Sequence, residues 1–381
     1  SGAIDLAALP TPPKVTPAVR LVSDEQRAAP TDIETKLIAI WREQLGVQQI
    51  DRDSHFFDLG GHSLLAVRMV TQASVAFGAK LDVLALFKAP TIHQFAEHIA
   101  SVTSHAKSVE SDDWKIVPLQ PNGEKRPFIV LNNTILYYGL AKQFGQNQPL
   151  YGVQNYKPDA DAPEEVRSLE EIAADYVKLV RAVQPKGPYK LIGLCVAGII
   201  AYEVAQQLAA DGEEPPTVIM FDSWAPGYAQ SLPKHKRLLR DADEWFHYQK
   251  RRFQSWRAGE ITTVDFLLRY NFIQRIVRAA VALGIVKKMP EREFLWHPGF
   301  EGYLSRARSA YRPKAYAGDV LMFRSDEFPT GPLHDRKMGW DGIVKGRLAV
   351  KDISGGHLNV CAGENAVVVA TNIDAFLSNA S

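Results

Sequence analysis

The sequence has 381 residues, with 44 Lys and Arg against 43 Asp and Glu, 46% hydrophobic residues and a formal net charge of +1. That length allows two or three hydrophobic cores, and the composition excludes fibrous, disordered and membrane-spanning classes. The balanced charge gives no reason to expect binding to nucleic acid or to an anionic membrane. Two cysteines, Cys195 and Cys361, cannot form a disulfide framework or a multi-thiolate zinc site. We therefore expect a cytoplasmic protein without a metal.

Proline dominates the beginning of the chain. Five prolines within residues 1–30 oppose regular hydrogen-bonded structure, so residues 1–29 are predicted to be a linker. Thr31 then offers a helix N-cap and Gly46 a helix stop, with apolar residues at helical spacing between them. Further helical patterns follow Ser63 and Thr91. Residues 30–103 are predicted to form a small all-α four-helix bundle.

A polar stretch at 104–114 predicts a second linker, and the pattern then changes to α/β. Helical patterns at 169–183 and 199–208 alternate with short apolar or β-branched runs at 128–131, 189–192, 217–221, 320–323 and 348–350. This alternation predicts a mostly parallel sheet with flanking helices over residues 115–381.

An insertion interrupts the predicted sheet. Between about residues 231 and 300 helical patterns recur without a good strand, and the segment lies between two predicted strands. Such an insertion is a candidate lid. We expect the lid to be mobile and to exclude water, so that trimming its apolar face at Phe266, Leu267 or Phe272 would shift the products toward a hydrolysed acid.

The first chemical motif is DRDSHFFDLGGHSLL at residues 51–65. Ser63 follows two glycines and opens an amphipathic helix, which exposes it; for a shorter motif an ordinary helix N-cap would be the better interpretation. The whole run resembles the attachment signature of peptidyl carrier domains in nonribosomal peptide synthetases. The resemblance implies that Ser63 carries 4′-phosphopantetheine, whose thiol holds an acyl chain as a thioester. His62 would then belong to the recognition surface of the carrier.

The second chemical motif is IGLCVAG at residues 192–198, which follows a predicted strand and opens a predicted helix. This is the context of a nucleophile elbow. It would place Cys195 at a helix N-terminus, where the dipole and free N–H groups favour a thiolate. The backbone N–H of Val196 would supply one oxyanion-hole donor.

Two further residues complete a catalytic triad in the chain order nucleophile, acid, base that is typical of α/β-hydrolases. Asp222 stands at the end of the next predicted strand and could orient a histidine. His357 lies on a Gly-rich loop after the last predicted strand and would be the general base. Asp326, one strand after Asp222, is the rival acid, since many hydrolases use that position.

Residues 116–381 together resemble the type I thioesterase domains that terminate nonribosomal peptide and polyketide synthases. The matching text includes IVPLQPNG, QPLYGVQ, FDSWAPG, AYAGDVLMFRS and ISGGH. In that family the acid usually follows the strand after the elbow, which favours Asp222. Cysteine replaces the usual serine here and Ala197 replaces a glycine. The segment 132–136 replaces the family's His-Pro-Gly-Gly-like loop, so we expect the second oxyanion donor near Asn133 or Thr134.

A cysteine nucleophile has a chemical consequence. Transfer of an acyl group from the pantetheine thiol to Cys195 leaves a thioester, so the acyl-enzyme stays activated. This suits release by intramolecular attack into a strained ring such as a β-lactone. Hydrolysis and carbon–carbon coupling of acyl units by the same triad are the alternatives, because family resemblance does not choose among them. A non-catalytic scaffold, with a working carrier and an inactive hydrolase-like domain, is the alternative from a different class.

The resemblance also implies partners. These are the upstream condensation and adenylation domains of the same assembly line, a phosphopantetheinyl transferase that acts on Ser63, and the acyl or peptidyl thioester substrate. The opening SGAIDLAALP resembles the last motif of an adenylation domain, with Ala3 where that family has a lysine. We therefore expect the chain to be a piece of a longer assembly-line enzyme.

Overall fold

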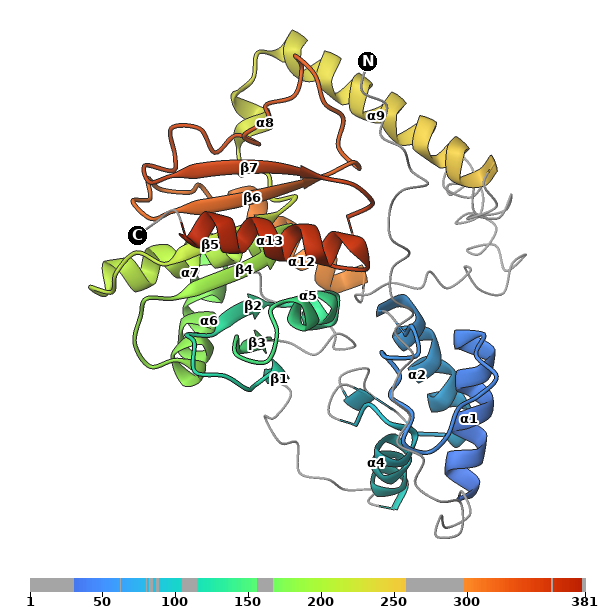
Figure 1. The fold of residues 1–381 in the computed structure, drawn as a ribbon. Coiled ribbons are helices and arrows are strands. Elements are labelled where there is room, and N and C mark those ends of the chain that lie inside the picture. Colours follow the sequence, from blue (N-terminus) through green and yellow to red (C-terminus); the bar gives the residue numbers. More distant parts are fainter. Residues whose placement is uncertain are drawn as a thin grey trace, which may run out of the picture.

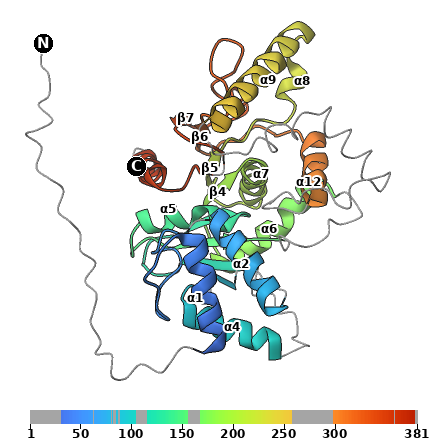
Figure 2. The ribbon, with the colours of Figure 1, turned by 90° about the vertical axis from the view of Figure 1, so that its right-hand side faces the viewer.

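The structure, a computed structural model, describes residues 31–61, 63–79, 81, 85–86, 89–104, 115–155, 167–257, 298–357 and 359–378. It has a helical part up to residue 104 and an α/β part from residue 115, which lie side by side in both ribbon views (Figures 1 and 2). Within these ranges no helix combines the length and the apolar character needed to cross a membrane.

The helical part contains α1 (Asp32–Leu45), α2 (Ser63–Phe77) and α4 (Ile92–Ser104). The first helix begins and ends where its sequence predicts. The Thr31 hydroxyl accepts a hydrogen bond from the Glu34 N–H at 3.2 Å, and the Glu34 carboxylate accepts one from the Thr31 N–H at 2.7 Å, which closes a capping box. Gly46 ends the helix with a left-handed φ of 67°.

One hydrophobic core holds the helical part together. Trp41 of α1 packs edge-on against Phe56, with ring centroids 5.0 Å apart, and Met69 of α2 and Phe95 of α4 are fully buried in the same cluster. Phe56 comes from the loop between α1 and α2, so the core also fixes the loop that leads to Ser63. The predicted helical bundle is confirmed in this part of the chain.

The α/β part contains a seven-stranded sheet in the order β1-β3-β2-β4-β5-β6-β7. The strands are β1 (Ile116–Gln120), β2 (Phe128–Leu131), β3 (Leu150–Val153), β4 (Lys190–Leu194), β5 (Thr217–Phe221), β6 (Val320–Ser325) and β7 (Leu348–Ile353). Neighbours pair in parallel except β1 and β3, which pair antiparallel. The carboxyl ends of β2 to β7 therefore lie at one edge, where α/β proteins place their sites.

The sheet is mostly parallel, as the sequence predicts. Two of its strands, β1 and β3, were not predicted. Both are short and interrupted by residues that weaken a strand pattern, Pro118 in β1 and Gly152 in β3. A proline is tolerated in β1 because that strand lies at the sheet edge.

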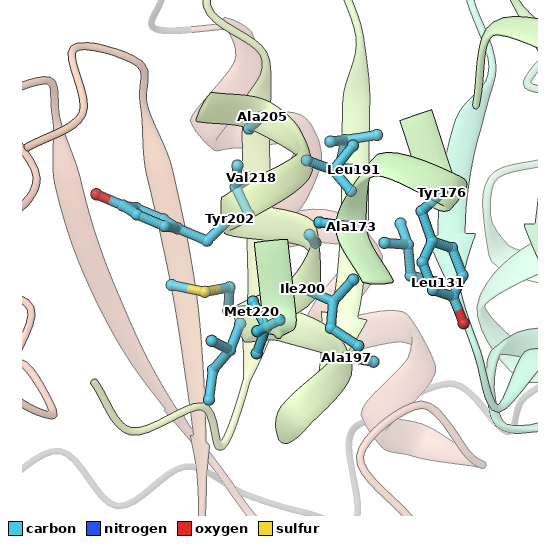
Figure 3. Packing of buried hydrophobic residues seen from close by; sticks show 14 of the residues in the cluster. Leu131, Ala173, Tyr176, Leu191, Ala197, Ile200, Tyr202, Ala205, Val218 and Met220 are labelled. Atoms are coloured by element: carbon cyan, nitrogen blue, oxygen red, sulfur yellow. The ribbon is translucent and has the colours of Figure 1, made fainter. Parts of the chain in front are cut away.

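Helices cover both faces of the sheet. One face packs against α6 (Leu169–Val183), α7 (Val196–Ala210) and α12 (Pro298–Ala310), and the other against α5 (Tyr138–Gln143) and α13 (Glu364–Ser378). The strand residues alternate between these two cores: Leu191, Val218 and Met220 face α7, whereas Ile192 and Ile219 face the other side. Figure 3 shows Ala205 of α7 close to Val218, and Ile200 of the same helix in the same hydrophobic cluster.

The predicted insertion between β5 and β6 contains α8 (Tyr228–Ser231) and α9 (Lys234–Arg257) before α12. Arg251 of α9 lies 3.8 Å from the Glu327 carboxylate, and His247 contacts the Asp326 carbonyl at 3.2 Å. Asp326 and Glu327 follow β6, so α9 lies beside loops at the carboxyl edge of the sheet (Figure 1). Phe266, Leu267 and Phe272, the predicted apolar face of the lid, fall outside the described residues.

Candidate active site

Cys195 stands at the turn between β4 and α7, as the elbow motif predicts. It has φ 55° and ψ −119°, a backbone conformation that costs a residue with a Cβ about 1 to 3 kcal/mol. The turn is held by the Cys195 N–H, which donates to the Phe221 carbonyl at 2.7 Å, and by the Ser223 hydroxyl, which donates to the Cys195 carbonyl at 2.8 Å. Both bonds tie the elbow to the neighbouring strand β5 and the segment after it.

Two glycines allow this turn to form. A Cβ at Gly193 would lie 2.4 Å from the backbone carbonyl of Ala197, and a Cβ at Gly198 would lie 2.1 Å from the Ser223 hydroxyl. Strand β4 and helix α7 therefore approach each other more closely than side chains would permit. Position 197, where the related family has a glycine, holds a buried alanine without disturbing the elbow.

Asp222 directly follows β5, and its side chain is fully buried. Its Oδ1 accepts the backbone N–H of Ser325 at 2.7 Å, and its Oδ2 accepts the Ser325 hydroxyl at 2.7 Å. A buried carboxylate needs such donors, because an unpaired charge away from water is costly. Ser325 thus holds the carboxylate from the end of the neighbouring strand β6.

His357 lies on the loop after β7, and its Nδ1 donates to the Asp222 Oδ2 at 2.8 Å. The ring also shares a hydrogen bond with the Cys195 side chain. The rival acid is elsewhere: the Asp326 carboxylate accepts the Gly355 N–H at 3.1 Å and so holds the backbone of the His357 loop. The structure therefore brings Cys195, His357 and Asp222 into one hydrogen-bonded line, and Asp326 supports the loop.

These contacts shift the pKa values of Cys195 and His357 in opposite directions. Burial by itself would raise the pKa of the Cys195 thiol, but the hydrogen bond and the charge of His357, together with the charge of Arg308, outweigh it and lower the pKa. Burial would lower the pKa of His357, but the hydrogen bonds with Asp222 and Cys195 outweigh it and raise the pKa to about 10. The arrangement favours a thiolate at Cys195 beside an imidazolium at His357, the ionisation state in which a cysteine can act as a nucleophile.

The predicted oxyanion donors lie at the same edge. The Val196 N–H, the first of α7, hydrogen-bonds the Cys195 side chain. After β2 the chain turns through Asn132 and Asn133, with φ of 55° and 49°, into the short 3₁₀ helix η4 (Thr134–Tyr137). Thr134 is buried in this turn. Tyr137, the last residue of η4, is fully buried. Burial raises the pKa of its hydroxyl well above the usual value, and the charges of Cys361 and Cys195 add smaller increases.

Ser63 lies apart from this line, as the first residue of α2 in the helical part. Gly60 precedes it in a left-handed conformation with φ 94°, which only glycine adopts without strain. A helix N-terminus accommodates a phosphate well because its free N–H groups and its dipole favour negative charge. The backbone at Ser63 therefore fits a phosphodiester, which is the group that the sequence motif predicts there.

The sequence prediction missed Ser325 as a support of the acid. A signal was present, because the run at 320–323 was predicted to be the next strand of a mostly parallel sheet after the run at 217–221, and carboxyl ends of parallel strands share one edge. It also missed the placement of Tyr137, which depends on the turn at the two asparagines. Across the described ranges, no three His, Cys, Asp or Glu side chains form a group that could hold a metal ion.

Comparison with known proteins gives two family matches in one chain. The thioesterase domain family matches residues 131–377, and the phosphopantetheine attachment site family matches residues 35–99. A dimodular nonribosomal peptide synthase of Bacillus subtilis (strain 168) is 28% identical over 96% of this chain. Malpibaldin synthetase of Mortierella alpina is 34% identical over 98% of it. The chain spans only 15% and 6% of the length of these two relatives.

Among solved structures, a four-domain nonribosomal peptide synthetase bound to AMP and glycine covers 98% of this chain, at a TM-score of 0.49 and 24% sequence identity. This chain covers 28% of that structure. The thioesterase match alone extends over more than half of the residues and contains the elbow, Asp222 and His357. The chain belongs to the thioesterase domain family, with a phosphopantetheine attachment domain in front of it that marks 4′-phosphopantetheine as its covalent cofactor.

Proposed function

We propose that this chain is the chain-terminating part of a nonribosomal peptide synthetase, in which Ser63 presents an acyl thioester and Cys195 accepts it. The observation that carries the proposal is the hydrogen-bonded line from Cys195 through His357 to Asp222. It is supported by the attachment domain in the same chain and by relatives named as nonribosomal peptide synthases. Upstream condensation and adenylation domains and a phosphopantetheinyl transferase are the proposed partners.

We place the carrier domain at residues 30–103 and the thioesterase domain at 115–381, with linkers at 1–29 and 104–114 and the lid at about 231–300. The proposed boundary is supported by the positions of α4, which extends to Ser104, and β1, which begins at Ile116. Pantetheine on Ser63 supplies a thiol that holds the acyl chain as a thioester.

The transfer step uses the residues at the elbow. The Cys195 thiolate attacks the carbonyl carbon of the acyl thioester, and the oxygen that becomes negative accepts hydrogen bonds from backbone N–H groups, for which we propose Val196 and Thr134. The carbon–sulfur bond to the pantetheine thiol then breaks, and the His357 imidazolium gives its proton to the departing sulfur. The products are an acyl group on Cys195 and a neutral His357.

The release step reverses these roles. Neutral His357 takes the proton of the attacking nucleophile, the carbon–sulfur bond to Cys195 breaks, and the thiolate and imidazolium are restored. Because the acyl-enzyme is a thioester, it remains activated, and we propose release by intramolecular attack into a strained ring such as a β-lactone. Hydrolysis and carbon–carbon coupling of acyl units would use the same triad and are distinguished by product analysis of the natural loaded chain.

The test is intact-mass spectrometry. A phosphopantetheinyl transferase with coenzyme A should add one pantetheine to the chain, and Ser63→Ala should abolish the addition. After loading with an acyl-pantetheine, an acyl adduct should appear on Cys195, and Cys195→Ala should leave the acyl group on Ser63. Asp222→Asn should slow release by orders of magnitude, whereas Asp326→Asn should slow it far less. Permanent retention on Ser63 in the unaltered chain would instead favour a non-catalytic scaffold.

A further inference from the structure

The two parts of the chain touch through a small set of aromatic and charged side chains. Phe57, from the loop before α2, packs on Tyr138 of α5 with ring centroids 4.2 Å apart, and the His55 ring stacks over the same tyrosine at 6.3 Å. The Lys142 ammonium lies 2.6 Å from the Asp58 carboxylate and 5.3 Å from the centre of the Tyr138 ring. Tyr138 packs against the hydrophobic core of the helical part.

Each side of this contact adjoins one of the two chemical sites. On the helical part, Asp58 precedes Ser63 by five residues in the DLGGHS motif. On the α/β part, Tyr138 follows Thr134 by four residues, and α5 continues directly from η4. The contact therefore links the loop before the attachment serine to the helix that follows the proposed oxyanion segment.

We propose that α5 is the surface on which the chain's own carrier domain docks when it transfers its acyl group to Cys195. In this docking Phe57 packs on Tyr138, and Asp58 forms an ion pair with Lys142. This inference rests on the proposed function of Ser63 and Cys195. The partner is defined by its chemistry: an aromatic ring followed directly by a carboxylate, just before a helix that begins with the modified serine.

The ion pair and the stacked rings contribute to docking in different ways. The Asp58 and Lys142 side chains are 64% and 44% exposed, so their ion pair contributes little affinity and mainly sets orientation. The rings are partly buried at the contact. Burial, with the nearby Asp58 charge, raises the pKa of Tyr138 to about 12, and burial lowers the pKa of His55. Weak docking is sufficient here, because the linker keeps the carrier close to its target at a high effective concentration.

The test measures single-turnover transfer from acyl-pantetheine on Ser63 to Cys195 in the full chain. Tyr138→Ala should slow transfer about tenfold, a loss equivalent to one well-packed aromatic contact. Asp58→Lys and Lys142→Asp should each slow it several-fold, and the double exchange should restore most of the rate. The control is Lys337→Asp, which breaks an ion pair of similar length and exposure (2.7 Å, 48% and 70%) elsewhere in the α/β part and should leave the rate unchanged.

A second measurement separates docking from chemistry. A soluble acyl thioester that bypasses the carrier should acylate Cys195 equally fast in all of these variants. Unchanged or faster transfer from Ser63 in Tyr138→Ala, or single exchanges that the double exchange fails to restore, would overturn the docking surface while leaving the proposed function intact. If neither the soluble thioester nor the carrier acylates Cys195 in the unaltered chain, the proposed function itself fails.

Discussion

At the residue scale, burial raises the pKa of the Cys195 thiol and the hydrogen bond with His357 lowers it. The net result is a pKa below the usual value of the thiol, so the thiolate should persist at pH values where an ordinary cysteine is protonated. The raised pKa of His357, about 10, keeps the imidazolium present over the same range. The reactive pair should therefore exist above the lowered cysteine pKa and disappear as the pH rises through about 10.

Alkylation of Cys195 by iodoacetamide tests this balance. In the unaltered chain the rate should rise with pH around a midpoint below the usual thiol value of about 8.5. In His357→Ala the largest effects that oppose burial are lost, and only the charge of Arg308 and the Val196 N–H still lower the pKa of the thiol. The midpoint should therefore rise, and alkylation at neutral pH should slow by about tenfold or more, since one pKa unit is a factor of ten. Cys361 serves as an internal control, because it is fully buried and its pKa is raised. An identical midpoint in both proteins would contradict the role of His357.

Ser325 should act as a positioning residue for the acid. Ser325→Ala removes the hydroxyl donor to Asp222 while leaving the backbone N–H donor in place. A hydrogen bond to a charged group contributes about 1.5 to 3 kcal/mol, and we expect acylation of Cys195 to slow by about tenfold as the carboxylate loses its fixed orientation. Ser325→Thr keeps a hydroxyl and should restore most of the rate. Equal loss in both variants would indicate a packing effect rather than a hydrogen bond.

At the scale of elements, the position of Cys195, the proposed nucleophile, depends on how closely β4 approaches α7. Gly193→Ala would place a Cβ 2.4 Å from the Ala197 carbonyl, which is backbone and cannot rotate away. We expect overpacking to cost about 1 to 3 kcal/mol and the opened elbow to lower acylation of Cys195 by soluble thioester by about a hundredfold.

The matched control for this prediction is Gly212→Ala at the far end of α7. Gly212 has φ 89° with no atom within 4 Å of a built Cβ, so alanine there adds only backbone strain, about 1 kcal/mol. Its melting temperature should fall while acylation of Cys195 stays normal. Full activity in Gly193→Ala would show that the elbow tolerates a wider separation of strand and helix.

At the scale of the whole molecule, the two parts have separate hydrophobic cores. Trp41 is fully buried in the core of the helical part and Trp340 in that of the α/β part. Trp41→Ala should cost about 3 to 5 kcal/mol, enough to unfold a small bundle, and so abolish loading of Ser63. Soluble thioester should still acylate Cys195 at the normal rate.

Trp340→Ala should give the opposite pattern. Its indole N–H donates to the Ser223 carbonyl at 2.6 Å, and Ser223 in turn holds the Cys195 carbonyl, so the elbow should lose its support. Loading of Ser63 should remain normal. Loss of both activities in either variant, measured by intact mass, would mean that the two cores fold as one cooperative unit.

Much of this protein is determined by short stretches of sequence. Thr31 and Gly46 bound α1 because caps act on neighbouring backbone groups, and the runs that became β2 and β5 are continuous apolar segments of strand length. Ser63, Cys195 and His357 were predicted as site residues because each stands in a local motif with a characteristic turn. The families that match the chain agree with the two motif-based domains.

Other features were decided only by tertiary structure. Asp222 and Asp326 both follow strands at the same edge, and only the packed loop after β7 decides that His357 meets Asp222 while Asp326 holds the Gly355 N–H. The ion pair of Asp58 with Lys142 joins residues 84 apart in sequence. Local patterns carry no information on such pairs, because their distance depends on how whole elements pack, and that packing is set by the two separate cores and the contact between them.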